Sequence, residues 1–230
     1  MTGVQTCALP ISGRSDVWVQ DAGQVDSVPT DTGGTGTAPP ALAGADGPEC
    51  ASALLGRMVA AGAASGGVRC PSEQLDPADA AALREMLTSL AAQGHRRVAA
   101  VGDRSPRGLA ATRTVAAAAA ARGIELVPPG VAGVPLLVTS GWSDAGTLLR
   151  RVAGGDLPAN GTYLAPWLFT EPLLAIDAGH HIGVRFDAAA ESFQRYRSEL
   201  RAGYPTQPAS AAGYEAWLSE RSRSAPSIVD

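Results

Sequence analysis

The feature that most constrains the fold of this chain is a regular alternation of strand and helix signals between residues 76 and 218. Asp76-Pro77 is typical of a helix start, because aspartate caps free N–H groups and proline fits the first turn. Apolar residues then recur at helical spacing up to Gly94, which is typical of a helix end. The short apolar run 97–101 predicts a strand that is buried on both faces.

The same alternation continues toward the C-terminus. Further strands are predicted at 124–127, 134–139, 162–164 and 181–185. Further helices are predicted at 106–122, 143–154, 171–178, after Asp187, and around Trp217. Ser143 and Asp187 are the predicted caps of the helices that they precede. This order favours an α/β fold with a doubly wound, mainly parallel sheet, preceded by a flexible N-terminal segment. In such sheets, ligands bind beyond the carboxyl ends of the strands.

Four regions are expected along the chain. Residues 1–12 resemble the translation of a short-read sequencing adapter, which predicts that the natural N-terminus is missing; a signal peptide is disfavoured because no basic segment precedes the short apolar run. Residues 13–48 include a stretch rich in Gly, Pro and Thr and predict a flexible segment. Residues 49–222 are expected to form the α/β unit, and 223–230 a polar tail.

Two cysteines belong to the predicted α/β unit, Cys50 and Cys70. They are either a disulfide or two free buried thiols, and the sequence leaves both open. A zinc site is not expected, because the pair lacks Cys-x-x-Cys spacing and a nearby histidine. A disulfide would suit an exported protein and would stabilise it by roughly 3 kcal/mol.

Charge and motifs exclude several functions. The 18 basic residues, all arginine, and 22 acidic residues give a net charge of −4, so no basic face for nucleic acid is expected. No apolar run is long enough to span a membrane.

Sequence motifs for the common nucleotide-binding and hydrolytic enzymes are absent: there is no dinucleotide-binding, P-loop or hydrolase-elbow motif. His180 and His181 alternate across a strand, so they cannot share a metal ion. We therefore expect a non-enzymatic protein without metal or cofactor.

Three stretches together carry a resemblance to a known family. They are RVAAVGDRSPRG (97–108), LLVTSGWSDAGTLLRR (136–151) and the segment 186–217, with its Phe-Asp, Tyr-Pro and Ala-Gly-Tyr-Glu-Ala elements. Their order over residues 75–218 resembles the second lobe of type I periplasmic binding proteins. These are the solute receptors of branched-chain amino acid ABC importers. On this reading, residues 13–48 include at most a remnant of the first lobe.

The resemblance implies a clamp that closes on a small polar solute, an ABC permease as partner, and an extracellular or cell-surface location. The signal or lipid anchor would have been lost with the natural N-terminus. The matching positions give the candidate ligand-binding residues Asp103, Ser105, Ser140, Trp142 and Trp167. For the aspartate and Ser105 the alternative role is helix capping. For the two tryptophans it is packing in the core.

Two departures from the family narrow the expectation. The segment around Trp167 lacks the carboxylate that amino-acid receptors present to the ligand's ammonium group, so a free amino acid is not expected as the ligand. The connection 127–134 is too short for a helix. The alternatives are a ligand-sensing regulatory or receptor domain of the same fold, a degenerate member that binds nothing, and an α/β enzyme that uses Asp103 or His181.

Overall fold

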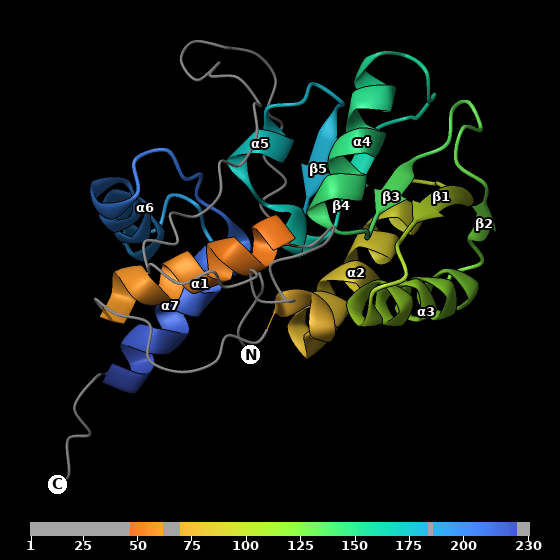
Figure 1. Ribbon diagram of the computed structural model, residues 1–230. Coiled ribbons are helices and arrows are strands. Elements are labelled where there is room, and N and C mark those ends of the chain that lie inside the picture. Colours follow the sequence, from red (N-terminus) through yellow and green to blue (C-terminus); the bar gives the residue numbers. More distant parts are fainter. Residues whose placement is uncertain (1–46, 62–69, 184–185, 225–230) are drawn as a thin grey trace, which may run out of the picture.

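The computed structural model describes residues 47–61, 70–183 and 186–224 (Figure 1). The helices are α1 (Gly47–Ala61), α2 (Pro77–Ala92), α3 (Pro106–Ala120), α4 (Trp142–Ala153), α5 (Glu171–Leu174), α6 (Glu191–Gly203) and α7 (Ala211–Ser224), with short 3-10 helices η2 (Pro71–Glu73) and η3 (Pro166–Leu168). The strands are β1 (Arg97–Val101), β2 (Glu125–Val127), β3 (Leu136–Val138), β4 (Thr162–Leu164) and β5 (His180–Ile182).

The five strands form one parallel sheet in the order β2-β1-β3-β4-β5. From β1 the chain moves outward to β2, and from β3 it moves the opposite way to β4 and β5. Because parallel crossovers are right-handed, α3 must cover one face of the sheet, and α4 and α5 the other (Figure 1). The strand order reverses between β1 and β3, because β2 lies on one side of this pair and β4 and β5 lie on the other. The predicted α/β class with a doubly wound parallel sheet is confirmed.

Local sequence explains where the first helices begin. Asp76 accepts a hydrogen bond from Ala78 N at 2.7 Å, and Pro77 opens α2 as predicted. Ser105 caps α3, and Pro106 occupies the first position of that helix. Each cap satisfies a backbone donor that the helix itself leaves open, and each contributes about 1 kcal/mol.

Several predicted boundaries need correction. α4 is capped by Gly141 and not by Ser143, which lies in the first turn, because the helix begins one residue earlier at Trp142. Asp187 does not cap α6; its carboxylate accepts from Ala189 N in a turn, and the helix begins at Glu191. The predicted helix 171–178 is only four residues long, since Pro172 opens it and the turn at 175–179 leads straight into β5.

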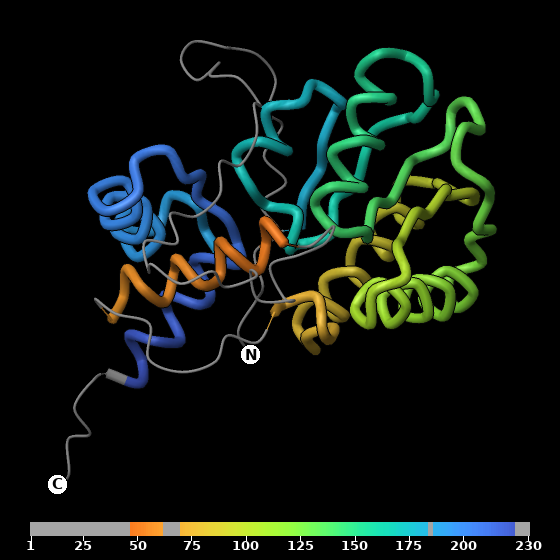
Figure 2. Tube along the Cα trace, in the orientation of Figure 1, coloured from red at the N-terminus to blue at the C-terminus, as the bar shows by residue number. Residues whose placement is uncertain are grey.

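The described residues contain two hydrophobic clusters. The larger lies between the sheet and its helices and includes Val98, Leu136, Leu149 and Leu164. The smaller is aromatic and lies among α1, α6 and α7, which we call the helical group. Its members are Leu55, Phe193, Tyr196, Leu200, Ala209, Tyr214 and Trp217. Figures 1 and 2 show α1 and α7 side by side, next to the sheet and not on either of its faces.

The packing of α1 on α7 depends on two glycines. A Cβ atom placed on Gly56 would collide with the backbone of Gly213, and one placed on Gly213 would collide with the Tyr196 hydroxyl. The helices therefore approach so closely that only glycine fits at their crossing. No described helix is both long enough and apolar enough to pass through a lipid bilayer. The expected segment 1–12 and most of the expected segment 13–48 lie outside the described residues.

Candidate functional site

The carboxyl ends of β1, β3 and β4 bring all five candidate ligand residues into one region. Asp103 and Ser105 follow β1, Ser140 and Trp142 follow β3, and Trp167 follows β4. The strand order reverses between β1 and β3, and a crevice opens at such a reversal in doubly wound sheets. The predicted positions are thus adjacent in space although they span 65 residues of sequence.

Asp103 connects two of the loops at this edge. One carboxylate oxygen accepts from Ser105 N at 2.8 Å and from Ser105 Oγ at 2.6 Å. The other oxygen accepts from Gly141 N, at the start of α4. Ser105 Oγ in turn accepts from Gly108 N at 3.0 Å, within the first turn of α3. Ser105 therefore has the capping role that the sequence offered as its alternative. Asp103 caps no helix, and instead connects the loop after β1 to Gly141, the residue before α4.

The two tryptophans brace the loops after β3 and β4. Trp142 Nε1 donates to the Trp167 carbonyl at 2.9 Å, and Trp167 Nε1 donates to the Ser140 carbonyl at 3.0 Å. Both indoles are buried, with 9% and 4% of their surface exposed. This reciprocal pair satisfies both indole donors inside the protein, as buried tryptophans generally require. The Ser140 hydroxyl is buried and has no hydrogen-bond partner among the described residues.

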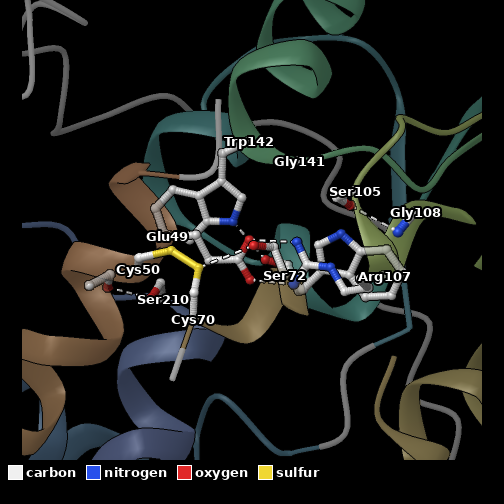
Figure 3. A network of polar contacts seen from close by, with 12 residues as sticks. Glu49, Cys50, Cys70, Ser72, Ser105, Arg107, Gly108, Gly141, Trp142 and Ser210 are labelled. Carbon is white, nitrogen blue, oxygen red and sulfur yellow. Dashed lines mark hydrogen bonds and ion pairs between the residues drawn. A yellow bond between two sulfur atoms is a disulfide. The ribbon is translucent and has the colours of Figure 1, made fainter. Parts of the chain in front are cut away.

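A buried ion pair lies against Trp167. Arg107, the second residue of α3, donates to Glu49 of α1 through both terminal nitrogens, each at 2.6 Å. Glu49 is fully buried and Arg107 is 2% exposed. The guanidinium carbon lies 4.5 Å from the centre of the Trp167 ring, within range of a cation–π interaction. Figure 3 shows the guanidinium and the carboxylate facing each other, so this pair joins the helical group to the sheet region.

The disulfide lies beside this pair (Figure 3). Cys50, next to Glu49 in α1, is bonded to Cys70, which immediately precedes η2. Both cysteines are buried, and Cys70 Sγ lies 3.1 Å from Ser72 Oγ. Of the two possibilities that the sequence left open, the structure has the bridge. It fastens α1 to the segment that leads into α2.

A pocket of about 190 Å³ opens beside Trp167 and Arg107. Its walls come from α1, η2, the start of α2, the start of α3, η3 and the start of α7; the lining residues are Glu49, Cys70, Pro71, Gln74, Asp76, Asp79, Arg107, Trp167, Ala211, Ala212 and Glu215. Helices that follow or precede parallel strands run antiparallel to them, so the starts of α2 and α3 lie at the carboxyl edge of the sheet. The pocket is therefore on the side of the sheet where doubly wound folds generally bind ligands. Of the five candidate residues, only Trp167 lines it.

Sequence reasoning missed the charged part of this pocket. Arg107 directly follows the Ser-Pro start of a helix, and such a position is usually solvated. Glu49 precedes Cys50, but nothing in the sequence indicates that a carboxylate 58 residues from Arg107 would pair with it. The cysteine pair was the one partial signal for this contact, because a bridge between Cys50 and Cys70 brings Glu49 toward the start of α2.

Comparison with protein-family models and with curated proteins found no match. Among solved structures, the chain is similar to an ABC transporter solute-binding protein from R. palustris in complex with benzoate, with 11% identity and a TM-score of 0.49 over 62% of this chain and 46% of that one. It is also similar to a possible leucine/isoleucine/valine-binding protein from Rhodopirellula baltica, with 14% identity and a TM-score of 0.46, over 62% of this chain and 47% of that one.

A third similar structure is an ABC transporter substrate-binding protein from Desulfitobacterium hafniense in complex with Leu, with 18% identity and a TM-score of 0.31, over 61% of this chain and 47% of that one. The chain spans about half the length of the structures it matches. The likeness is one of fold alone.

Proposed function

We propose that this chain is the α/β lobe of an extracellular solute-binding protein that serves an ABC-type importer. The lobe holds a small polar solute at the carboxyl edge of its sheet, works without catalysis, and delivers the solute to a membrane permease. The three motif stretches at 97–108, 136–151 and 186–217 motivate the family. The disulfide supports export, because such bonds persist in oxidising compartments.

The observation that carries the proposal is the pocket beside Trp167. It is a concave site at the carboxyl edge of a doubly wound sheet, which is where this architecture places ligands. Trp167 and the buried Arg107–Glu49 pair are among the residues that line it. A solute in this pocket would contact an aromatic face together with polar groups that the fold already holds in place.

One alternative is favoured by a specific observation. Four of the five candidate residues are away from the pocket, and three of these, Asp103, Ser105 and Trp142, use their polar side-chain groups on hydrogen bonds within the protein. That pattern suits a degenerate member of the family that keeps the fold and binds no solute. The two functions differ in whether any solute stabilises the native state.

The test is thermal denaturation in the presence of a panel of sugars, carboxylic acids, amides and amino acids. A solute at 100 times its Kd adds about 2.7 kcal/mol to the free energy of unfolding. For a chain of this size that corresponds to a rise in Tm of about 5–11 °C. Panel members that raise Tm in this way support the proposal.

A variant that blocks the pocket tests whether the stabilising solute binds there. Gln74 is exposed and lines the pocket, so Gln74→Trp should fill the entrance without disturbing the core and should abolish the shift. Gln93, exposed at the other end of α2, offers the matched control Gln93→Trp, which should leave the shift intact. A panel without any stabilising solute would favour the degenerate, non-binding alternative.

A further inference from the structure

A second hollow lies where β1 and β2 end against α3. Its volume is about 140 Å³, and it shares no residue with the pocket beside Trp167. The walls are mostly aliphatic, and they are lined by Ala100, Gly102, Thr112, Val115, Leu126, Val127 and Thr139. Leu126 is 39% exposed, one of the few large apolar side chains open to solvent among the described residues.

Two hydroxyl groups converge inside this hollow. A Cβ atom placed on Gly102 would lie 2.8 Å from Thr112 Oγ1 and 3.1 Å from Thr139 Oγ1. The two oxygens, one from α3 and one directly after β3, therefore both lie close to the Cα of Gly102. A side chain at residue 102 would crowd both oxygens and hinder access to them.

Both hydroxyl protons are directed elsewhere. Thr112 Oγ1 donates to the Gly108 carbonyl at 2.9 Å, and Thr139 Oγ1 donates to the Val101 carbonyl at 3.3 Å. A hydroxyl that has donated its proton still carries lone pairs that can accept a hydrogen bond. The hollow thus offers acceptors to a ligand, and no ionisable side chain lines it.

From this geometry we infer a binding site for a short, uncharged aliphatic alcohol. The alkyl part would pack on Val115, Val127 and Leu126, and the hydroxyl would donate its one proton to either of the two threonine oxygens. An ammonium group could also donate, but it would lose hydration without meeting a counter-charge, which is unfavourable. A cavity of about 150 Å³ holds benzene, so this hollow has room for a ligand of about five or six non-hydrogen atoms. This site goes beyond the proposed function and does not depend on it.

The test uses three probes of similar size on the full chain, followed by ¹H–¹⁵N NMR titration. Isobutanol has the alkyl body and one donor; diethyl ether has the same formula without a donor; isobutylammonium has a donor and a charge. We expect saturable shifts of the Gly102, Thr112 and Leu126 amides with isobutanol. Diethyl ether should bind about three- to tenfold more weakly, because it cannot form the hydrogen bond. Isobutylammonium should not saturate the site.

Two variants make the test specific. Gly102→Ala should weaken isobutanol binding, because the added methyl group crowds both threonine oxygens. Thr112→Val, at an exposed helix position, keeps the shape, removes one acceptor, and should weaken binding about three- to tenfold. Equal binding of isobutanol and diethyl ether, undiminished binding to a folded Gly102→Ala protein, or shifts that never saturate would each overturn the inference.

Discussion

Replacing Glu49 by glutamine should destabilise this protein more than any surface substitution of the same kind. The carboxylate is fully buried and accepts two hydrogen bonds of 2.6 Å from Arg107, which is itself 2% exposed. Glutamine has nearly the same shape but carries no charge, and its amide nitrogen turns a donor toward the guanidinium. The variant would thus bury a positive charge without its bidentate carboxylate.

The expected cost follows from that burial. Removing one partner of a buried ion pair lowers the free energy of unfolding by about 3–5 kcal/mol, because the remaining charge stays desolvated. At about 2–4 °C per kcal/mol for a chain of this length, Tm should fall by about 6–20 °C. Urea denaturation followed by circular dichroism measures the free energy, and differential scanning calorimetry measures Tm.

The exposed pair Arg97–Glu125 provides the matched control. Its nitrogen and oxygen lie 3.6 Å apart, and the two side chains are 51% and 69% exposed. Because solvent screens such a pair, Glu125→Gln should change the free energy of unfolding by at most about 1 kcal/mol. If Glu49→Gln cost no more than Glu125→Gln, the reasoning that the buried pair fastens α1 to α3 would be wrong.

Three further predictions concern the helical group and its attachment. The double variant Cys50→Ala/Cys70→Ala should lose about 3 kcal/mol of unfolding free energy, as expected for a bridge across a sequence separation of 20. Urea denaturation without reductant measures this loss, and equal unfolding of the variant and the natural chain would contradict the prediction. Burial raises the pKa of Tyr196 to about 12, so the folded state favours the neutral phenol. Because the phenol of the unfolded chain ionises near pH 10, this group should not affect stability below pH 10. It should lower the free energy of unfolding as the pH rises from about 10 to 12. Tyr196→Phe should remove that part of the alkaline fall in a pH series of urea titrations, and an unchanged profile would refute the assignment. Gly56→Ala should cost about 1–3 kcal/mol because its Cβ meets the backbone of α7, whereas Gly203→Ala, whose Cβ meets nothing within 4 Å, should be nearly neutral in the same denaturation assay.

The parallel sheet was predictable because its signals are local. An apolar run such as 98–101 favours a strand covered by helices, and in the structure Val98 and Ala99 are buried. Asp76-Pro77 and Ser105-Pro106 indicate a helix start through backbone chemistry alone. The connection between residues 127 and 134 was predicted to be too short for a helix, and the structure has turns there. The sequence-based prediction was wrong at the start of α4, where Gly141 and not Ser143 is the cap. Gly141 N donates to Asp103, and this contact between two loops fixes where the helix begins.

The position of the candidate residues at strand ends was predictable, but their contacts were not, and only Trp167 lines the pocket. The sequence placed Asp103, Ser140 and Trp167 at strand ends, and these residues do meet at one edge of the sheet. It could not show that the indole donors would bind backbone carbonyls, or that Glu49 would reach Arg107. Both depend on contacts between distant segments, and the helical group that supplies Glu49 depends on the close fit of Gly56 against Gly213.

The most direct test of the central claim follows the tryptophan indole N–H resonances while a stabilising solute is added. Trp167 lines the pocket, whereas Trp217 packs in the aromatic cluster of the helical group and donates to Glu199 at 2.7 Å. Solute binding at the carboxyl edge of the sheet predicts a saturable shift of the Trp167 resonance, with that of Trp217 unmoved. A solute that stabilises the protein while moving only the Trp217 resonance would contradict the account.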